Sequence, residues 1–368
     1  MSTFPIPTDA MGITFLKSIR DCIAVMGEAL LYQAGGAAGT PVALTGVWTE
    51  DTGVQASRPG AQASVCCRMS ALDIQLAQQE IVRSDKTGSL GITMGILGRR
   101  QVTFTTKMSL APNGAAGTKP DMDPLLTALM GKAPTIVAST SVTYGLDDQS
   151  PSVTLWDFNT PGTMTQRCTM GAIVKTGKFD IGVDEPTVEF IGQGLAVLDT
   201  DIFATADTIS KGGLTAFPTE PASPVTNGTP PPGFTGTITL DGNTYTTYRT
   251  GTITVDVDRE LPMDGFNSFY GIAPAAGLRN VTTDWSMYDD DSATLQSLKQ
   301  KAYTCTPVTL AFQIGTVAGS TWLFTLKNVL LAKPKFDYSG KRRVVAFSAC
   351  RAHDTTIGAK DAITISVQ

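Results

Sequence analysis

Histidine is almost absent from this chain, and its cysteines lack the spacing that metal sites use. The only histidine is His353, and no two of the six cysteines form a C-x-x-C pair. Zinc sites are built from His, Cys and carboxylate ligands at such short spacings, so we expect no metal site. A hydrolase triad needs histidine as its general base, and no nucleophile-elbow motif accompanies His353. The sequence therefore argues against a triad hydrolase.

Other recognisable chemical motifs are missing as well. No Walker-type loop occurs, and the glycines between Gly88 and Gly98 lack the strand-before, helix-after setting of a nucleotide site. The acidic runs at 147–148 and 289–291 do not follow the alternating pattern of a calcium loop, so we expect solvated loops or helix starts there. The paired carboxylates of a glycosidase cannot be singled out from one sequence. We predict a protein that is not an enzyme, with no catalytic residues and no cofactor.

Charge is scarce and long apolar runs are missing. Charged residues make up 17% of the chain, against about 25% in an average soluble domain. No apolar run approaches the roughly 18 residues of a membrane span, and no basic segment followed by an apolar core opens the chain. We therefore expect no membrane insertion and no signal peptide. The net charge of -5 disfavours a surface that grips phosphates and suits one that does not adhere to a polyanion.

The cysteines are expected to be small buried hydrophobes in a reducing cytoplasm, because free cysteine is among the most buried residue types. Two of them are adjacent in an expected strand and should face opposite sides of it. The six are Cys22, Cys66, Cys67, Cys168, Cys305 and Cys350.

What the sequence does contain is one β unit written twice. The stretch Lys175–Gly192 matches Ala332–Ala349 at an offset of 157 residues, so that Phe179 matches Phe336. Each copy predicts a hairpin, in which two alternating strands flank a turn marked by glycine. We expect four aromatic residues to anchor the cores of the two copies. They are Phe179, Phe190, Phe336 and Phe347.

Upstream strands repeat at a different offset. Residues 277–282 match 98–103 at an offset of 179, so the first copy is 22 residues longer between its two anchors (179 minus 157), and Ala111–Pro120 reads as part of the insertion. Residues 72, 74 and 76, and 253, 255 and 257, are apolar and alternate with polar residues, as half-buried strands do. Each copy then predicts a short helix, at 123–130 with Asp123 as its N-cap and at 292–302.

These patterns divide the chain into four parts. Residues 1–64 predict an N-terminal helix at 13–31, a short strand at 42–48 and a loop at 50–63, either packed on the first domain or docking on a neighbouring subunit as an arm. Residues 65–205 form the first domain and 235–368 the second. Residues 206–234 are a linker rich in proline, for which a proline-rich ligand segment is the alternative.

One family resemblance covers most of residues 65–368. Met108–Ala196 contains PLLTALM, SVTYG, SVTLWD, CTMGAIV and a hairpin from KTGKFDIG to EFIGQG. In this order and pattern it resembles the major tail tube proteins of long-tailed, siphovirus-type bacteriophages. Asp361–Val367 resembles the terminal strand of that family, whereas residues 1–64 depart from it.

The resemblance implies a mainly β fold of two tandem tail-tube-type β-sandwich or barrel domains, each with one short α-helix. It implies a structural virion protein whose sheets join edge to edge in rings, stacked head to tail into a tube for DNA ejection. Two domains per chain imply a trimeric, pseudo-hexameric ring. Implied partners are further copies of the chain, the tape measure, terminator and baseplate proteins, and DNA in transit. The implied location is the virion tail, assembled in the host bacterial cytoplasm.

Residue roles follow from this picture as expectations. Asp73, Gln75, Asp256 and Asp258 would face the lumen, or else the outer surface. Arg99, Arg100 and Arg279 open the returning strands and would pair with carboxylates at subunit contacts, or else be solvated. The alternative function is a carbohydrate- or host-binding β-sandwich protein of the virion, which would expose aromatic residues on a concave face. The four tryptophans, at 48, 156, 285 and 322, lie mostly in alternating strands, which favours core positions.

Overall fold

The computed structural model describes residues 52–57, 65–67, 71–83, 93–159, 165–182, 184–194, 196–199, 230–262 and 275–368. This part of the chain is mainly β, built of antiparallel sheets, as the sequence predicts. Two helices lie in it, α2 (Asp123–Met130) and α4 (Ala293–Thr304). The helix predicted at 13–31, the strand at 42–48 and the linker up to residue 229 lie outside the described residues. No helix in the described ranges could span a bilayer.

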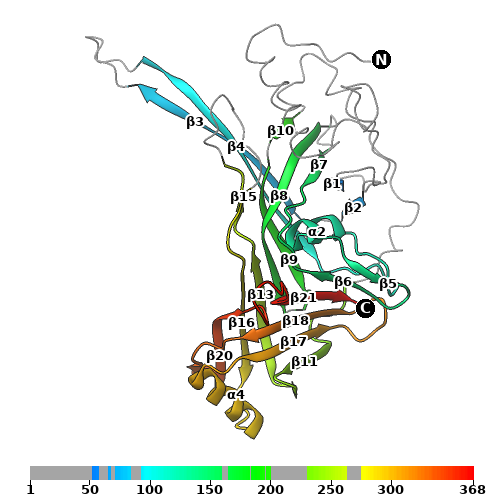
Figure 1. Ribbon diagram of the computed structural model, residues 1–368, viewed down its shortest axis with the longest axis vertical. Coiled ribbons are helices and arrows are strands. Elements are labelled where there is room, and N and C mark those ends of the chain that lie inside the picture. Colours follow the sequence, from blue (N-terminus) through cyan, green and yellow to red (C-terminus); the bar gives the residue numbers. More distant parts are fainter. Residues whose placement is uncertain are drawn as a thin grey trace.

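The strands that matter most form one continuous antiparallel path, β3-β4-β9-β8-β13-β16-β20-β19 (Figure 1). Their bounds are β3 Ala71–Arg83, β4 Thr93–Ser109, β8 Thr165–Ile181, β9 Thr187–Gly194, β13 Tyr248–Asp256, β16 Asn280–Tyr288, β19 Lys335–Asp337 and β20 Val344–Ala352. We call β3, β4, β9 and β8 the first repeat sheet, and β13, β16, β20 and β19 the second repeat sheet.

The two repeat sheets have the same strand order, and their pairing registers agree over much of their length. Corresponding pairs are related by an offset of 179 on the two early strands and 157 on the two late ones, but a bulge in the second sheet shifts the register by one residue at 281–283, where Val281 lies opposite Ala352. Matched pairs are Ile74↔Phe104 with Ile253↔Thr283, Thr106↔Phe190 with Trp285↔Phe347, and Phe179↔Val188 with Phe336↔Val345. The offsets read from the sequence therefore coincide with spatial equivalence in the sheets.

A second sheet packs against this path and closes the core. Its strand order is β12-β11-β17-β18-β21-β6-β5. Aromatic residues meet between the layers, with ring centroids 5.2 Å apart for Phe179 and Phe324 and 5.9 Å for Tyr248 and Phe312. The bounds are β5 Thr135–Val137, β6 Ser141–Gly145, β11 Gly236–Leu240, β12 Asn243–Tyr245, β17 Val308–Ile314, β18 Trp322–Val329 and β21 Ile363–Val367.

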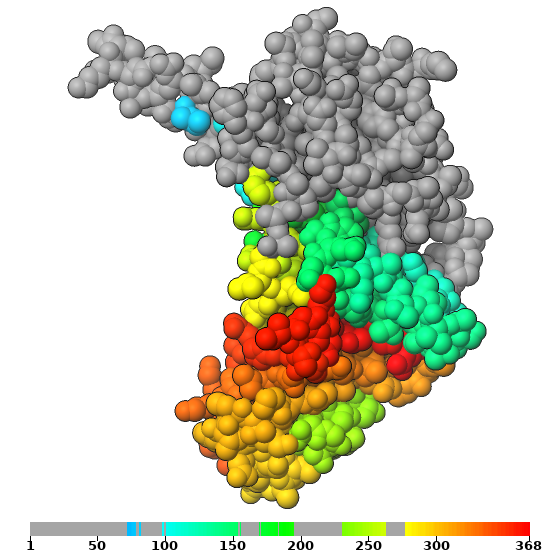
Figure 2. Space-filling view, in the orientation of Figure 1, coloured from blue at the N-terminus to red at the C-terminus, as the bar shows by residue number. Residues whose placement is uncertain are grey.

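This second sheet also mixes the two halves of the chain. The C-terminal strand β21 pairs with β18 on one side and with β6, from the first half, on the other. Figure 2 shows the red C-terminal part of the chain lying between the orange residues and the green ones. The loop at 110–120 adds a further tie, because the Trp322 indole Nε1 donates to the carbonyl of Leu110 over 3.0 Å. The two halves thus share one core rather than forming two separately packed units.

The helices differ in burial. Every residue of α2 is buried, and Gly177 on β8 leaves room for Leu129, whose Cδ2 would lie 2.4 Å from a Cβ at that position. Met122 is the N-cap of α2, so the prediction of Asp123 was wrong by one residue; Asp123 instead accepts a hydrogen bond of 2.9 Å from the Tyr144 hydroxyl. The helix α4 begins after Ser292, which caps it through Leu295 N, and buries one face only.

Near the N-terminal end of the described chain, two expectations need correction. Residues 52–57 were expected to be loop but form strand β1 (Thr52–Ser57), paired with β7 (Val153–Asn159) and with β2 (Val65–Cys67), so this stretch belongs to the sheet that contains β7 and β8. The outer half of the β3–β4 hairpin extends beyond β9 as a projecting arm (Figure 1). Leu76, expected inside, is 36% exposed beside this arm.

Candidate functional site

The two repeat sheets join edge to edge through β8 and β13, which we call the internal junction. Lys178 lies opposite Thr254, and Asp180 lies opposite Thr252, whose hydroxyl donates to the Asp180 carboxylate over 3.0 Å. Phe179, on the other face, is fully buried. The last strand of one repeat is thus completed by the first strand of the next.

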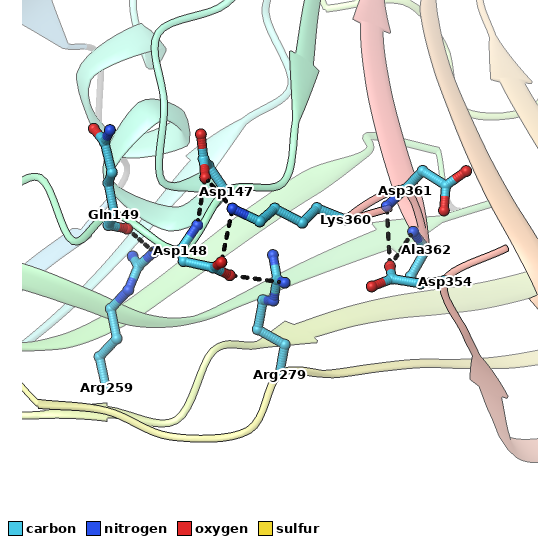
Figure 3. Close-up of polar contacts among 9 residues, drawn as sticks. All are labelled: Asp147, Asp148, Gln149, Arg259, Arg279, Asp354, Lys360, Asp361 and Ala362. Atoms are coloured by element: carbon cyan, nitrogen blue, oxygen red, sulfur yellow. Dashed lines mark hydrogen bonds and ion pairs between the residues drawn. The ribbon is translucent and has the colours of Figure 1, made fainter. Parts of the chain in front are cut away.

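Polar contacts clamp the internal junction on the side of α2 (Figure 3). The Arg259 side chain is buried and donates to two carbonyl oxygens of the first half, at Ala128 near the end of α2 and, over 2.6 Å, at Gln149. Carbonyls at a helix C-terminus carry partial negative charge, which suits a guanidinium. Burial, with a smaller contribution from the nearby Arg279 charge, lowers the pKa of Arg259 to about 10, so it remains charged at neutral pH.

An ion cluster lies beside this clamp. Lys360, close to the C-terminus, contacts the carboxylates of Asp147 and Asp148 at 2.7 Å each, and Arg279 reaches Asp148 at 3.0 Å. The hydrogen bonds from Lys360 are the main cause that lowers the pKa of both carboxyls. The two aspartates lie in a loop, as expected, and Asp148 is 65% exposed, but both also form ion pairs across the two halves.

The equivalent edge of the second repeat sheet has no such cover. Strand β19 pairs with β20 and with no other strand in the described ranges. Phe336, which occupies the position of Phe179, is 39% exposed, and the neighbouring Tyr338 is 68% exposed. The prediction that Phe336 is a core anchor is therefore wrong for the single chain. We call β19 and its exposed side chains the open edge.

A groove runs beside the open edge, between β19 and the exposed side of α4. It has a volume of about 570 Å³. Two cations that line it, Lys299 and Arg343, lie 5.5 and 5.6 Å from the Phe336 ring centroid. Its full lining is Asp291, Gln296, Lys299, Gln300, Tyr303, Phe336 and Arg343.

The same two cations hold a buried carboxylate. Asp289 contacts Lys299 at 2.8 Å and Arg343 at 2.5 Å, and its side chain is fully covered. Burial alone would raise the pKa of Asp289, but the hydrogen bonds and the two positive charges outweigh it and hold the pKa below its ordinary value. Asp289 lies just before the start of α4, one of the two expected settings for the run 289–291, and its side chain is buried rather than solvated. The network fixes the wall of the groove rather than forming a reactive centre.

The remaining candidate residues lie on the polar face of the repeat sheets or outside the described side chains. Asp73, Gln75 and Asp258 are exposed and Asp256 is partly exposed, on the face opposite the buried Ile74, Ile253 and Val255. Arg279 is placed at a contact between repeats of the same chain. The side chains of Arg99 and Arg100 lie outside the description.

The remaining expectations concern the burial of the phenylalanines, tryptophans and cysteines. Phe179, Phe190 and Phe347 are buried as predicted, and so are Trp285 and Trp322, whereas the side chains at 48 and 156 lie outside the described part. Cys350 is buried, and burial raises the pKa of its thiol to about 11. Cys305 is exposed, contrary to the expectation of a buried thiol.

Sequence reasoning missed the clamp and the ion cluster. Arg259 and Lys360 carry no motif, and their partners lie more than a hundred residues away in the chain. Within the described ranges, no group of three or more His, Cys, Asp or Glu side chains could hold a metal ion. Neither the models of known protein families nor the curated proteins give a match to this chain.

Proposed function

We propose that this protein is a structural subunit that assembles through its sheet edges into rings, and that the rings stack into the tail tube of a long-tailed bacteriophage. The observation that carries the proposal is the internal junction. Two repeats with one strand order, and with corresponding registers over much of their length, already join edge to edge within a chain. The same join between chains would leave no repeat edge unpaired.

The exposed edges support the same proposal. Long unpaired strand edges invite pairing with another chain, and monomeric proteins blunt or cover them. In the described part of the chain, β3 and β19 end the path of eight strands and each pairs with a single strand. A join of β19 to β3 of the next chain repeats the order of β8 to β13. Three chains supply six repeats, so the proposed ring is a trimer with pseudo-sixfold symmetry.

The polar face of the repeat sheets suits a conduit for DNA. It carries the exposed carboxylate of Asp73 and the partly exposed carboxylates of Asp180 and Asp256, interspersed with threonines and with cations such as the partly exposed Lys178. A face without a continuous basic stripe offers few sites for the counterion exchange that binds DNA. We place this face toward the lumen, with Asp73, Gln75, Asp256 and Asp258 on it, and the second sheet and helices outside.

The test is electron microscopy of the purified full-length protein and of tubes formed from it. We expect rings and tubes whose image symmetry gives three chains and six similar lobes per ring. Rings of six whole chains would contradict the trimer. A protein that stays a small defined species at every concentration would contradict the assembly itself and favour a binding module.

A further inference from the structure

The internal junction serves as a template for the contact between chains, residue by residue. On β8 and β13, Lys178 is opposite Thr254 and Asp180 is opposite Thr252. The equivalent residues are Lys335 and Asp337 on β19, by the offset of 157, and Gln75 and Asp73 on β3, by the offset of 179. The same register therefore sets Lys335 against Gln75 and Asp337 against Asp73.

From this register we propose that the junction between chains has a built-in charge conflict, Asp337 against Asp73, that makes it weaker than the internal junction. The inference rests on the proposed ring assembly and deepens it, since it names the partner strand, its register and the pair that tunes its strength. The occupant of the open edge is β3 of a second copy of this chain.

The interaction between the two side chains is attractive in the internal pair and repulsive in the equivalent pair between chains. Inside the chain, the Thr252 hydroxyl donates to Asp180, so the pair is favourable. Between chains, a carboxylate replaces that hydroxyl, and like charges directly opposite on neighbouring strands destabilise a sheet. Around these carboxylates, the Gln75 amide donates to Asp73 over 2.7 Å, and Lys335 shares the face of Asp337. The Ser339 N–H donates to Asp337 over 2.8 Å and is the main cause that lowers the pKa of Asp337, to which the positive charge of Arg249 adds.

A missing backbone donor also weakens the junction between chains relative to the internal junction. The Val257 N–H donates to the Lys175 carbonyl, so Lys175 turns its backbone groups toward the chain of β13. Backbone groups alternate in direction along an antiparallel strand, so Gly177, two residues further along β8, also turns its N–H toward β13. At the position of Gly177 the open edge carries Pro334, which has no N–H to donate. Proline on an edge strand is one way in which proteins blunt pairing. The open edge thus offers one donor fewer than its internal counterpart.

The test of strength compares Asp73→Thr, which restores the residue type of the internal junction, with wild type and with Asp184→Thr. Asp184 is an exposed aspartate between β8 and β9, so this control removes the same charge away from the edge. We expect Asp73→Thr to assemble at about two- to fivefold lower concentration than either, measured by sedimentation and counted in micrographs. Equal thresholds for the three proteins would overturn the charge conflict.

The test of register uses disulfide trapping in mixtures of Gln75→Cys and Lys335→Cys chains under mild oxidation. Facing positions on neighbouring strands bring Cβ atoms to about 4.5–5.5 Å, close enough to cross-link. We expect a cross-linked dimer of the two variants, and none when Gln101→Cys, on β4, replaces Gln75→Cys.

The outcomes separate the two proposals. Rings without this cross-link overturn the register and leave the tube function standing. Absence of rings for wild type and for Asp73→Thr at all concentrations overturns the tube function, and this inference with it.

Discussion

The two copies of the repeated hairpin, Lys175–Gly192 and Ala332–Ala349, place equivalent phenylalanines in different surroundings. In the first copy, Phe179 is fully buried because β13 completes the edge of β8 and Phe324 packs on its ring at 5.2 Å. In the second copy, Phe336 has the same register with its hairpin partner but is 39% exposed, because no described strand completes β19. Burial of this phenylalanine therefore depends on the neighbouring repeat and not on the hairpin itself.

The largest expected effect is on stability of the unassembled chain. Phe179→Ala should lower the free energy of unfolding by about 3–5 kcal/mol, as for a large aromatic in a closed core. Phe336→Ala should lower it by about 1 kcal/mol or less, since much of its ring is already in water. Urea denaturation of both variants, below the concentration of assembly, measures the difference. Equal losses would show that the two edges are equally closed and would remove the distinction.

The next largest effect concerns the side chains that stabilise the internal junction. Arg259→Ala should cost about 2–4 kcal/mol, because it removes charged hydrogen bonds to two carbonyls, of which the one at Ala128 belongs to a fully buried residue. Arg279→Ala is the matched control, with an expected loss of about 0–1 kcal/mol, because its partner Asp148 is 65% exposed and exposed ion pairs contribute little. Thermal unfolding of the two variants ranks them. A larger loss of stability for Arg279→Ala than for Arg259→Ala would show that the ion cluster, and not Arg259, stabilises the internal junction.

The smallest effect is a pH dependence of the same junction. The pKa values of Asp147 and Asp148 are lowered in the folded chain, chiefly by hydrogen bonds from Lys360. Lowered carboxyl pKa values contribute stability that is present above the ordinary value of 3.8 and is lost as pH falls through the folded values. Lys360→Met should therefore melt slightly below wild type at pH 5–7, and the gap should close below about pH 3.8. A gap that is unchanged at pH 3 would assign the role of Lys360 to packing.

Much of the secondary structure could be predicted, because alternation of apolar residues and turn glycines are local signals. The hairpins of both copies, the helix capped by Ser292 and the burial of Phe190 and Phe347 follow from such patterns. The strand at 52–57 was missed because its residues are mostly polar or small, and it is held by pairing with β7. Asp123 was assigned a capping role from its neighbour Pro124, but tertiary contact with Tyr144 uses its carboxylate instead.

By itself, the sequence determined that one β hairpin is written twice and which residues correspond, since equivalent strands need the same alternation and the same turn. The tertiary structure alone decided that the first copy's edge is closed by the second copy and that the second copy's edge is left open. The shared Lys-Phe-Asp segment around Phe179 and Phe336 does not decide their burial, because the strand that lies beside each of them determines whether water reaches the ring.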